Sequence, residues 1–350
     1  MRNRTLGDVM GLVTGDSVAQ AVAAAVELGV VEELAAGPRP VDALARAAGA
    51  DPDALYRLLR ALSGFGVVEE RDGRVFALTG MGEALRRGVP GAVGNLALMM
   101  GSAWHRRSWS ELADCVRTGR SAFERLYGGF AYYRDDPAAG RVFDEAMTDS
   151  SAALMEPLLR GYDFTRFRVI VDVGGGQGTL LAAALSRHPE GRGVLYDLPS
   201  VIARAGEPLE RAGVAGRCEL VSGDFFSGVP CGGDLYLLAN IVHDWDDEHA
   251  VRILANCAAA LSAGGGEGGD EEVDAGGDAG GRVLLVEAVM PETRNRPTPI
   301  MLIDLEMLVM CDGGRQRTAA ELDRLLSRAG LRLTDIRQGD VFSLVEAESR

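Results

Sequence analysis

Residues 169–181 read VIVDVGGGQGTLL, and this stretch decides the fold. A short apolar run ends in a glycine-rich turn, after which small and apolar residues resume. The pattern predicts a buried strand, a tight turn and a helix, which is the unit from which parallel α/β sheets are built. Gly174, Gly176 and Gly178 would let the backbone approach a ligand closely, and the N-terminus of the helix favours an anionic group.

The spacing of these glycines separates two classes of cofactor. The fingerprint of dinucleotide-binding proteins is Gly-x-Gly-x-x-Gly. Here the third glycine comes one residue early, at Gly178, and the next residue is Thr179. The spacing therefore argues against a nicotinamide enzyme and suits a smaller, nucleoside-type cofactor whose carboxylate tail meets the turn. For this stretch alone, a glycine-rich turn without a ligand is the alternative.

Strands and helices alternate from residue 168 to the end of the chain. Continuous apolar strands separated by helices indicate a mostly parallel sheet that is covered on both faces. We therefore predict an α/β fold with a Rossmann-like, mostly parallel seven-stranded sheet, whose last two strands are close enough in sequence to be antiparallel. The predicted strands cover residues 168–173, 193–196, 219–221, 235–240, 283–288, 331–336 and 341–346, and the predicted helices 177–187, 199–212, 248–261 and 318–329.

The first hundred residues have the pattern of a winged helix. After a long helix over 8–35, two shorter helices over 40–48 and 52–64 precede two strands, over 67–70 and 75–78, that flank an Asp-Gly turn. This region contains 10 arginines against 12 acidic residues, a net charge of −2, whereas a DNA-reading surface is basic. We therefore favour a role in dimerisation or as a substrate lid over DNA binding.

The N-terminal helix also predicts the quaternary state. Residues 17–36 are rich in alanine and valine on most faces, which is more apolar surface than one small domain is expected to cover. We therefore expect a homodimer formed through residues 1–100, as an N-terminal α-helical dimerisation domain. The other predicted regions are a helical substrate-pocket region over 101–165 and a catalytic domain over 166–350.

Composition narrows the partners and the compartment. The formal charge of −15 argues against a nucleic-acid partner, because phosphate backbones bind basic surfaces, whereas an acidic surface suits a cationic cofactor. The five cysteines are scattered, without a Cys-x-x-Cys pair, so we expect free thiols in a reducing cytoplasm and no zinc site. The apolar run over 19–31 is short and contains Glu27, so we expect no membrane span. Residues 262–281 contain nine glycines and six acidic residues, and we predict a disordered surface loop there.

Polar residues follow three further predicted strands. Asp197 ends the second strand, where an acidic residue can accept hydrogen bonds from both ribose hydroxyls. Asp224 and Phe225 follow the third, where a carboxylate could bind the adenine amino group while the ring packs on the base. His243 follows the fourth strand, on the edge where open α/β sheets bind ligands, and a histidine there could take a proton from a phenol. The alternatives are turn-forming aspartates and a histidine that caps a loop.

The acidic residues around the histidine allow a second interpretation. Asp244, Asp246 and Asp247 could be imagined as metal ligands. Asp246 and Asp247, however, stand where a helix begins, and acidic residues are favoured there as caps and in the first turn. We therefore predict no metal site and keep Asp244 among the candidate catalytic residues.

Six sequence motifs, given at the end of this paragraph in chain order, resemble those of a known protein family. They recur in class I S-adenosylmethionine-dependent O-methyltransferases, the plant caffeate and flavonoid enzymes and their bacterial relatives in aromatic natural-product pathways. The resemblance extends over nearly the whole chain, including WxxL and RTG at 109–119 and FxxAM at 143–147. The motifs are VDVGGGQG, YDLP, GDFF, HDWDD, VLLVEAVMPE and GGRQRTAAEL.

The resemblance implies a role for individual residues. It implies that His243 accepts the proton of the acceptor hydroxyl and that Glu287 orients the imidazole. It implies S-adenosylmethionine as the cofactor, held by Gly174, Asp197, Asp224 and Phe225, with Gly176 in the same turn. Met147 and Met307 match positions near the methyl donor and the substrate.

The implied function is methyl transfer to a hydroxyl of a small aromatic, phenolic or polyketide-like natural product in secondary metabolism. One departure concerns the base: many members have a second glutamate where this chain has Gln316, which can hydrogen-bond an imidazole but cannot stabilise its cation by charge. Two alternatives stay open. One is a hydroxylase or decarboxylase that retains the cofactor on the same fold, and the other is a ligand-sensing winged-helix regulator.

Overall fold

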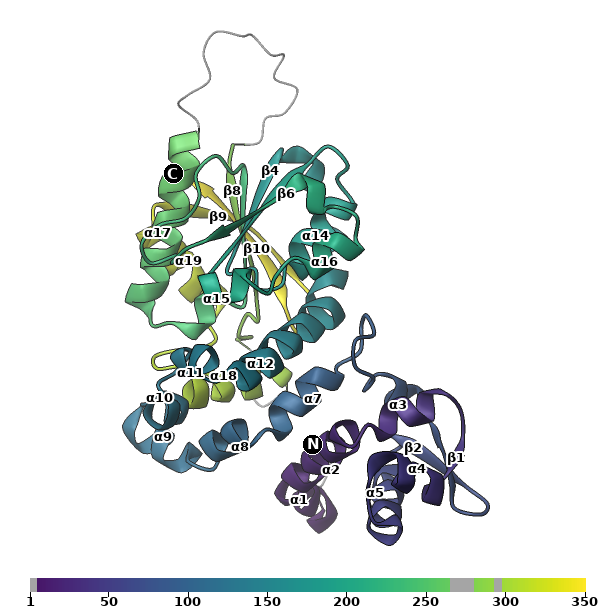
Figure 1. Cartoon of the computed structure of the whole chain (residues 1–350). Helices are drawn as coiled ribbons and strands as arrows, with labels where there is room; N and C mark the ends of the chain where they lie inside the picture. Colours follow the sequence, from purple (N-terminus) through teal and green to yellow (C-terminus); the bar gives the residue numbers. More distant parts are fainter. Residues whose placement is uncertain (1–4, 265–279, 293–297) are drawn as a thin grey trace. The chain divides into compact units, whose positions relative to one another are not determined.

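The computed structural model describes residues 5–264, 280–292 and 298–350. The chain forms two compact units (Figure 1). The first runs up to Arg107 and includes Ala138–Ala153, and the second comprises Ser108–Pro137 and Leu154–Arg350.

The second unit is built on the seven-stranded sheet that the sequence predicts. The strand order is β6-β5-β4-β7-β8-β10-β9, with β10 antiparallel to both of its neighbours and the other strands parallel. The predicted α/β class and the antiparallel final pair are therefore confirmed. The strands are β4 (Val169–Val173), β5 (Arg192–Asp197), β6 (Cys218–Ser222), β7 (Leu235–Ala239), β8 (Arg282–Glu287), β9 (Leu331–Gln338) and β10 (Ser343–Ser349).

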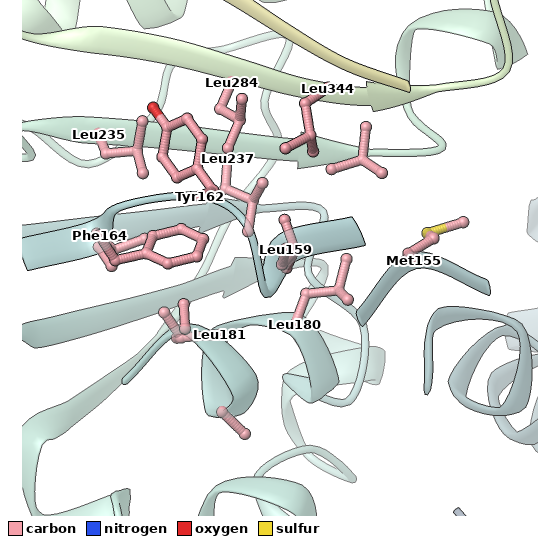
Figure 2. Packing of buried hydrophobic residues seen from close by; sticks show 14 of the residues in the cluster. Met155, Leu159, Tyr162, Phe164, Leu180, Leu181, Leu235, Leu237, Leu284 and Leu344 are labelled. Carbon is pink, nitrogen blue, oxygen red and sulfur yellow. The ribbon is translucent and has the colours of Figure 1, made fainter. Parts of the chain in front are cut away.

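Alternate residues of the central strands enter two different cores, which is why the strands read as continuous apolar runs. Leu235 and Leu237 of β7 pack with Leu181 of α14 and Tyr162 on one face, a cluster shown in Figure 2. Tyr236 and Leu238 face the opposite core. The helices are α14 (Thr179–Ser186), α15 (Pro199–Ile202) and α16 (Glu207–Arg211) on the first face, and α17 (Asp247–Gly264) and α19 (Ala319–Arg328) on the second (Figure 1).

The strand order indicates where the sheet can bind a ligand. From β4 the chain adds β5 and β6 on one side, and then β7 and β8 on the other. Such a reversal opens a crevice at the carboxyl ends of the two strands beside it, and open α/β sheets bind their ligands there. The glycine turn follows β4 and the His243 segment follows β7, so the two strongest motifs flank this point.

The first unit has the predicted winged-helix elements, with one difference. The single helix expected over 8–35 is three helices, because the backbone is interrupted at Thr14 and again at Gly29, which has a φ of 69°. A short strand, β1, also pairs with β3. The elements are α1 (Leu6–Val13), α2 (Gly15–Glu27), α3 (Val30–Ala35), β1 (Arg39–Pro40), α4 (Val41–Ala48), α5 (Pro52–Gly64), β2 (Val68–Arg71), β3 (Val75–Leu78), α6 (Gly80–Glu83) and α7 (Gly94–Gly101).

The connecting region is helical, as predicted, but it is more broken than the sequence suggested. Within the helical region expected over 101–165, a π-helical turn at Ser151–Met155 comes just before Pro157, whose ring nitrogen cannot donate a hydrogen bond. The helix expected over 199–212 is divided into α15 and α16. The helices are α8 (Ala103–Trp109), α9 (Leu112–Thr118), α10 (Ala122–Tyr127), α11 (Ala131–Asp135), α12 (Pro137–Ser150) and α13 (Glu156–Leu159).

Two further segments differ from the sequence-based expectation. No helix was expected between the fifth and sixth strands of the sheet before residue 318, yet α18 (Pro299–Met310) lies there, apolar on all sides. In the predicted loop over 262–281, residues 262–264 form the end of α17, and residues 265–279 lie outside the described residues.

The exposed apolar side chains of the first unit concentrate on α1. Leu6, Leu12 and Val13 are each more than 70% exposed, whereas Val30 and Leu34 of α3 are buried in the core of the unit. The most exposed apolar side chains of the unit therefore lie on α1, although Leu28, within the expected segment 17–36, is also exposed. Within the described residues, no single helix is long and apolar enough to cross a membrane; α1 and α2, bent by 48°, satisfy the criteria of length and composition only as a pair.

Candidate functional site

The glycine turn after β4 needs glycine for two separate reasons. Gly174, Gly176 and Gly178 have φ values of 66°, 57° and 83°, in the left-handed region that favours glycine. At Gly174 a Cβ would also collide with the side chain of Ile241, in the segment that follows β7. The turn is thus shaped by backbone conformation and by close packing against the second strand at the crevice.

The structure brings Asp197 and Phe225 to this turn. The amide N–H of Gly176 donates to Asp197 Oδ2 at 2.9 Å. The ring of Phe225 lies beside Gly174, since a Cβ there would be 3.7 Å from Phe225 Cε1. Asp224 is exposed, and its Oδ1 accepts a hydrogen bond from Phe226 N at 2.8 Å, so it also forms the local turn.

Unpartnered polar atoms mark the same edge of the sheet. Asp172 Oδ2 and Asn240 Oδ1 are buried without a hydrogen-bond partner in the described part of the chain. Asn240 also has a φ of 56°, which is uncommon outside glycine. A buried acceptor without a protein partner is costly, so these two oxygens are candidates for hydrogen bonds from a ligand. S-adenosylmethionine fits such a set, because its amino-acid part supplies an ammonium group and its ribose supplies hydroxyl donors.

His243 is held rigidly at the end of β7. Its Nδ1 lies 2.7 Å from Glu287 Oε2, and the other oxygen of Glu287 accepts from Val242 N at 2.8 Å. His243 is 7% exposed and Glu287 is 2% exposed. Because an ionised carboxylate only accepts hydrogen bonds, Nδ1 carries a proton and Nε2 is left to exchange one.

Two carboxylates control the charge of this imidazole. Asp244 Oδ1 lies 3.4 Å from His243 Nε2. Burial disfavours the imidazolium, but Glu287 and Asp244 outweigh this effect and raise the pKa of His243 to about 9. Burial raises the pKa of Asp244 to about 6, and the thiol of Cys311 donates to its Oδ1 at 3.4 Å. The pocket therefore favours a positively charged histidine in the empty protein.

The other acidic residues of the HDWDD motif are structural. Asp246 Oδ1 accepts from His249 N at 2.9 Å at the start of α17. Asp247 pairs with the buried guanidinium of Arg317, which also donates to the carbonyl oxygens of Val242 and Trp245. Arg317 thus ties the histidine segment to the start of α17.

Gln316 does not form the hydrogen bond expected of it. Its backbone N–H donates to Asp304 Oδ1 at 2.8 Å, but its side-chain Nε2 is buried without a partner in the described residues. A small cavity borders Gln316, His243 and Glu287. The amide therefore lies next to the His243–Glu287 pair without a direct hydrogen bond to it.

Aromatic side chains gather near the histidine segment. Phe130 stacks on Trp245, with ring centroids 6.1 Å apart. Tyr133 contacts Phe130 in turn, and burial, together with the nearby Cys311, raises its pKa well above 10. Trp109 Nε1 donates to Glu306 Oε2 of α18 at 2.6 Å. These aromatic side chains lie within the second unit, and Tyr133 is close to Asp244 and Cys311.

The structure adds residues that the sequence analysis missed. Asp172, Asn240, Cys311 and Glu306 join the site only through the fold. Asp172 stood inside the quoted glycine motif, so an acidic residue in an otherwise apolar strand could have signalled it. The predicted Met147 lies on α12 in the first unit, and Met307 lies on α18 in the second.

Comparisons with family models and with known proteins indicate the same protein family. A model of the O-methyltransferase domain matches residues 109–332, and a model of the O-methyltransferase dimerisation domain matches residues 10–87. Phenazine O-methyltransferase PhzM of Lysobacter antibioticus is 36% identical over 342 residues, which cover 97% of this chain and 95% of that protein. Phenazine-1-carboxylate N-methyltransferase of Pseudomonas aeruginosa is 32% identical and covers 92% of this chain and 91% of its own length.

A solved structure of a relative contains a cofactor and an aromatic ligand. The O-methyltransferase NcsB1 from neocarzinostatin biosynthesis, in complex with S-adenosylmethionine and 2-hydroxy-5-methyl naphthoic acid, has a TM-score of 0.74 and 32% identity over 95% of this chain and 96% of its own. Family models, full-length relatives and fold agree. The chain therefore belongs to the S-adenosylmethionine-dependent O-methyltransferases with an N-terminal dimerisation domain.

Proposed function

We propose that the protein transfers the methyl group of S-adenosylmethionine to a hydroxyl of a small aromatic natural product, with His243 as the general base. The observation that carries the proposal is the buried pair of His243 Nδ1 and Glu287 Oε2, 2.7 Å apart. Glu287 fixes the tautomer and orientation of the ring, so that Nε2 faces the acceptor side. His243 lies at the carboxyl edge of the sheet, after the strand that neighbours the glycine turn.

The charges of the cofactor and of the side chains around His243 indicate the role of each group in the reaction. The bound cofactor supplies an electrophilic methyl group on a sulfonium. An oxygen–carbon bond forms as the sulfur–carbon bond breaks, and the proton of the acceptor hydroxyl passes to His243 Nε2. The imidazolium that results is stabilised by Glu287 and Asp244, the two carboxylates that raise the pKa of His243. Holding the acceptor oxygen in line supplies the rest of the rate enhancement.

The empty protein holds His243 mostly protonated at neutral pH, so the base must first lose a proton. The positive charge of the bound cofactor opposes the imidazolium and lowers the pKa of His243 towards the working range. Asp244 lies beside Nε2 and is positioned to interact with a second polar group of the acceptor. Cofactor binding and base activation are thus linked through charge.

For the cofactor itself, we assign the glycine turn to the amino-acid part, Asp197 to the ribose hydroxyls, and Asp224 with Phe225 to the adenine. Gly174 and Gly176 supply the close backbone approach, and Asp197 already lies on the turn through Gly176 N. The family resemblance assigns Met147 to the methyl donor.

For the acceptor, the ring stack of Phe130 on Trp245 and the neighbouring Tyr133 favour a flat aromatic molecule. The relatives named above act on phenazines and bind a naphthoic acid, which are flat and aromatic. One of them is an N-methyltransferase, so an aromatic nitrogen is a second candidate nucleophile. We further propose a homodimer, formed through the matched dimerisation domain and the exposed apolar side chains of α1.

His243→Ala tests the base. Removing a general base typically lowers the rate by about 10²–10⁴-fold, whereas S-adenosylmethionine affinity should stay within about twofold, because His243 acts on the acceptor. The loss should shrink for phenols of low pKa, which already present an oxyanion. A panel of phenols with labelled cofactor, analysed by mass spectrometry, gives the readout. A His243→Ala variant as fast as the parent at pH 7 refutes the assignment.

The same panel separates the competing reactions. Conversion of an acceptor without a gain of one methyl group would replace methyl transfer with the hydroxylase or decarboxylase alternative. Transfer to an amine, with phenols left unchanged, would replace the oxygen nucleophile with nitrogen. A gel shift on operator-like DNA would support the regulator.

A further inference from the structure

Asn240 combines two features that each cost folding free energy. Its φ is 56°, in the left-handed region that residues other than glycine rarely adopt. Its side-chain oxygen Oδ1 is buried and has no hydrogen-bond partner among residues 5–264, 280–292 and 298–350. Backbone strain of this kind clusters at ligand-binding sites, and a buried acceptor without a donor calls for a functional explanation.

The backbone around Asn240 is fixed between the glycine turn and the strand that carries Glu287. Asn240 directly follows β7, the strand beside β4, and its N–H donates to Val286 O of β8 at 3.1 Å. The next residue, Ile241, packs on the glycine turn, since a Cβ at Gly174 would be 2.4 Å from Ile241 Cδ1. Asn240 is therefore anchored beside the turn to which we assign the amino-acid part of the cofactor.

A second acceptor without a donor lies on the neighbouring strand. Asp172 Oδ2 on β4 has no partner in the part of the chain that the structure describes, and it lies 2.7 Å from a Cβ placed at Gly175. Asp197, assigned to the ribose hydroxyls, belongs to β5, which adjoins β4 on the side opposite to β7. The donors that remain for the β7 side of the turn are therefore those of the amino-acid part.

That amino-acid part contains one group that donates and one that accepts. Its carboxylate only accepts hydrogen bonds, whereas its ammonium group has three N–H donors. We infer that Asn240 is a cofactor-binding residue whose Oδ1 accepts a hydrogen bond from this ammonium group. Because the group has three donors, it can also serve Asp172 Oδ2. The inference rests on the proposed assignment of the glycine turn and is independent of the role of His243.

Asn240→Gly tests the inference, because glycine adopts the same φ without strain and only the side chain is lost. Calorimetry of the full-length protein compares S-adenosylhomocysteine with 5′-methylthioadenosine, an adenosine thioether without ammonium and carboxylate groups. The affinity for S-adenosylhomocysteine should fall roughly 10–100-fold, as for a lost hydrogen bond to a charged group, and that for 5′-methylthioadenosine should change by less than about twofold. Equal changes for the two ligands overturn the inference.

Asn240→Asp distinguishes the oxygen of the amide from its nitrogen. The variant keeps an acceptor in place of Oδ1 and replaces the Nδ2 donor by a second acceptor. Its affinity for S-adenosylhomocysteine should stay close to that of the parent. A loss as large as that in Asn240→Gly would show that the amide donates to the carboxylate of the ligand, and it would overturn the assignment to the ammonium group.

The melting temperature of the empty protein separates ligand binding from a structural role. Asn240→Gly should melt close to the parent, because the backbone strain and the unpartnered oxygen disappear together. A clearly lower melting temperature, or failure to fold, would show that the side chain stabilises the empty protein and would overturn the inference. A parent that binds neither S-adenosylhomocysteine nor S-adenosylmethionine would overturn the cofactor assignment as well, whereas a parent that binds both, with unchanged affinity in Asn240→Gly, overturns the inference alone.

Discussion

Glu287→Gln is the change with the sharpest expected consequence for the proposed base. The two oxygens of Glu287 accept from two donors, His243 Nδ1 and Val242 N, at 2.7 Å and 2.8 Å. A glutamine of the same shape offers one acceptor oxygen and one amino group, so one of the two donors must face another donor. The variant therefore loses both the negative charge and half of the geometry that holds the imidazole.

The pKa of His243 gives the magnitude. It is raised from 6.5 to about 9, and Glu287 is the larger of the two carboxylate contributions. Its removal should lower the pKa of His243 by at least about one unit, equivalent to about 1.4 kcal/mol. The midpoint of the acidic limb of kcat/KM should fall by the same amount, and the plateau rate above it by about tenfold, because a weaker base accepts the proton less readily. The loss should be smaller at pH 7, where the parent is mostly protonated.

The assay is kcat/KM for one phenol between pH 6 and pH 10 at saturating S-adenosylmethionine. Glu248→Gln is a matched control, because it removes one negative charge from an exposed position at the start of α17. This control should reproduce the parent profile. A Glu287→Gln variant with an unchanged midpoint and plateau would show that Glu287 does not set the basicity of His243.

Three further outcomes are expected. Asp197→Ala should weaken S-adenosylmethionine binding by roughly 1.5–3 kcal/mol, since the ribose hydroxyls lose a charged acceptor, and unchanged affinity in calorimetry would remove Asp197 from the site. Leu12→Glu places a charge on the exposed apolar face of α1 and should convert a dimer into monomers in light scattering; a monomeric parent at micromolar concentration would refute the dimer. Asp172→Asn should raise the melting temperature of the empty protein at pH 8 and leave it unchanged at pH 4. The reason is that the folded pKa of Asp172, about 7, lies above the unfolded value near 3.8, so the parent loses stability as the pH rises between these values, by up to about 4 kcal/mol; equal melting temperatures at pH 8 would contradict this.

Local patterns in the sequence were sufficient to predict the strands of the second unit. The apolar run and glycine turn at 169–181 predicted β4, the turn and α14 in the correct order. The sequence pattern also predicted all seven strands. The central strands read as continuous apolar runs because they are buried on both faces, whereas the edge strands β6 and β9 are partly exposed. Asp197 and Phe225 were identified because strand ends in a parallel sheet meet at one edge, and both lie at the turn.

Only the tertiary structure decided which side chains meet. His243 and Glu287 are 44 residues apart, and they touch because β7 and β8 are neighbours, which the local pattern does not state. The break at Gly29 and the start of α18 have local signals that the sequence analysis did not use, namely a glycine with positive φ and the Thr298 cap followed by Pro299. The burial of Asp172 follows from strands β5 and β7 on either side of β4. Periodicity along the chain determines the elements, whereas burial and the ionisation of a side chain depend on neighbours that are distant in sequence.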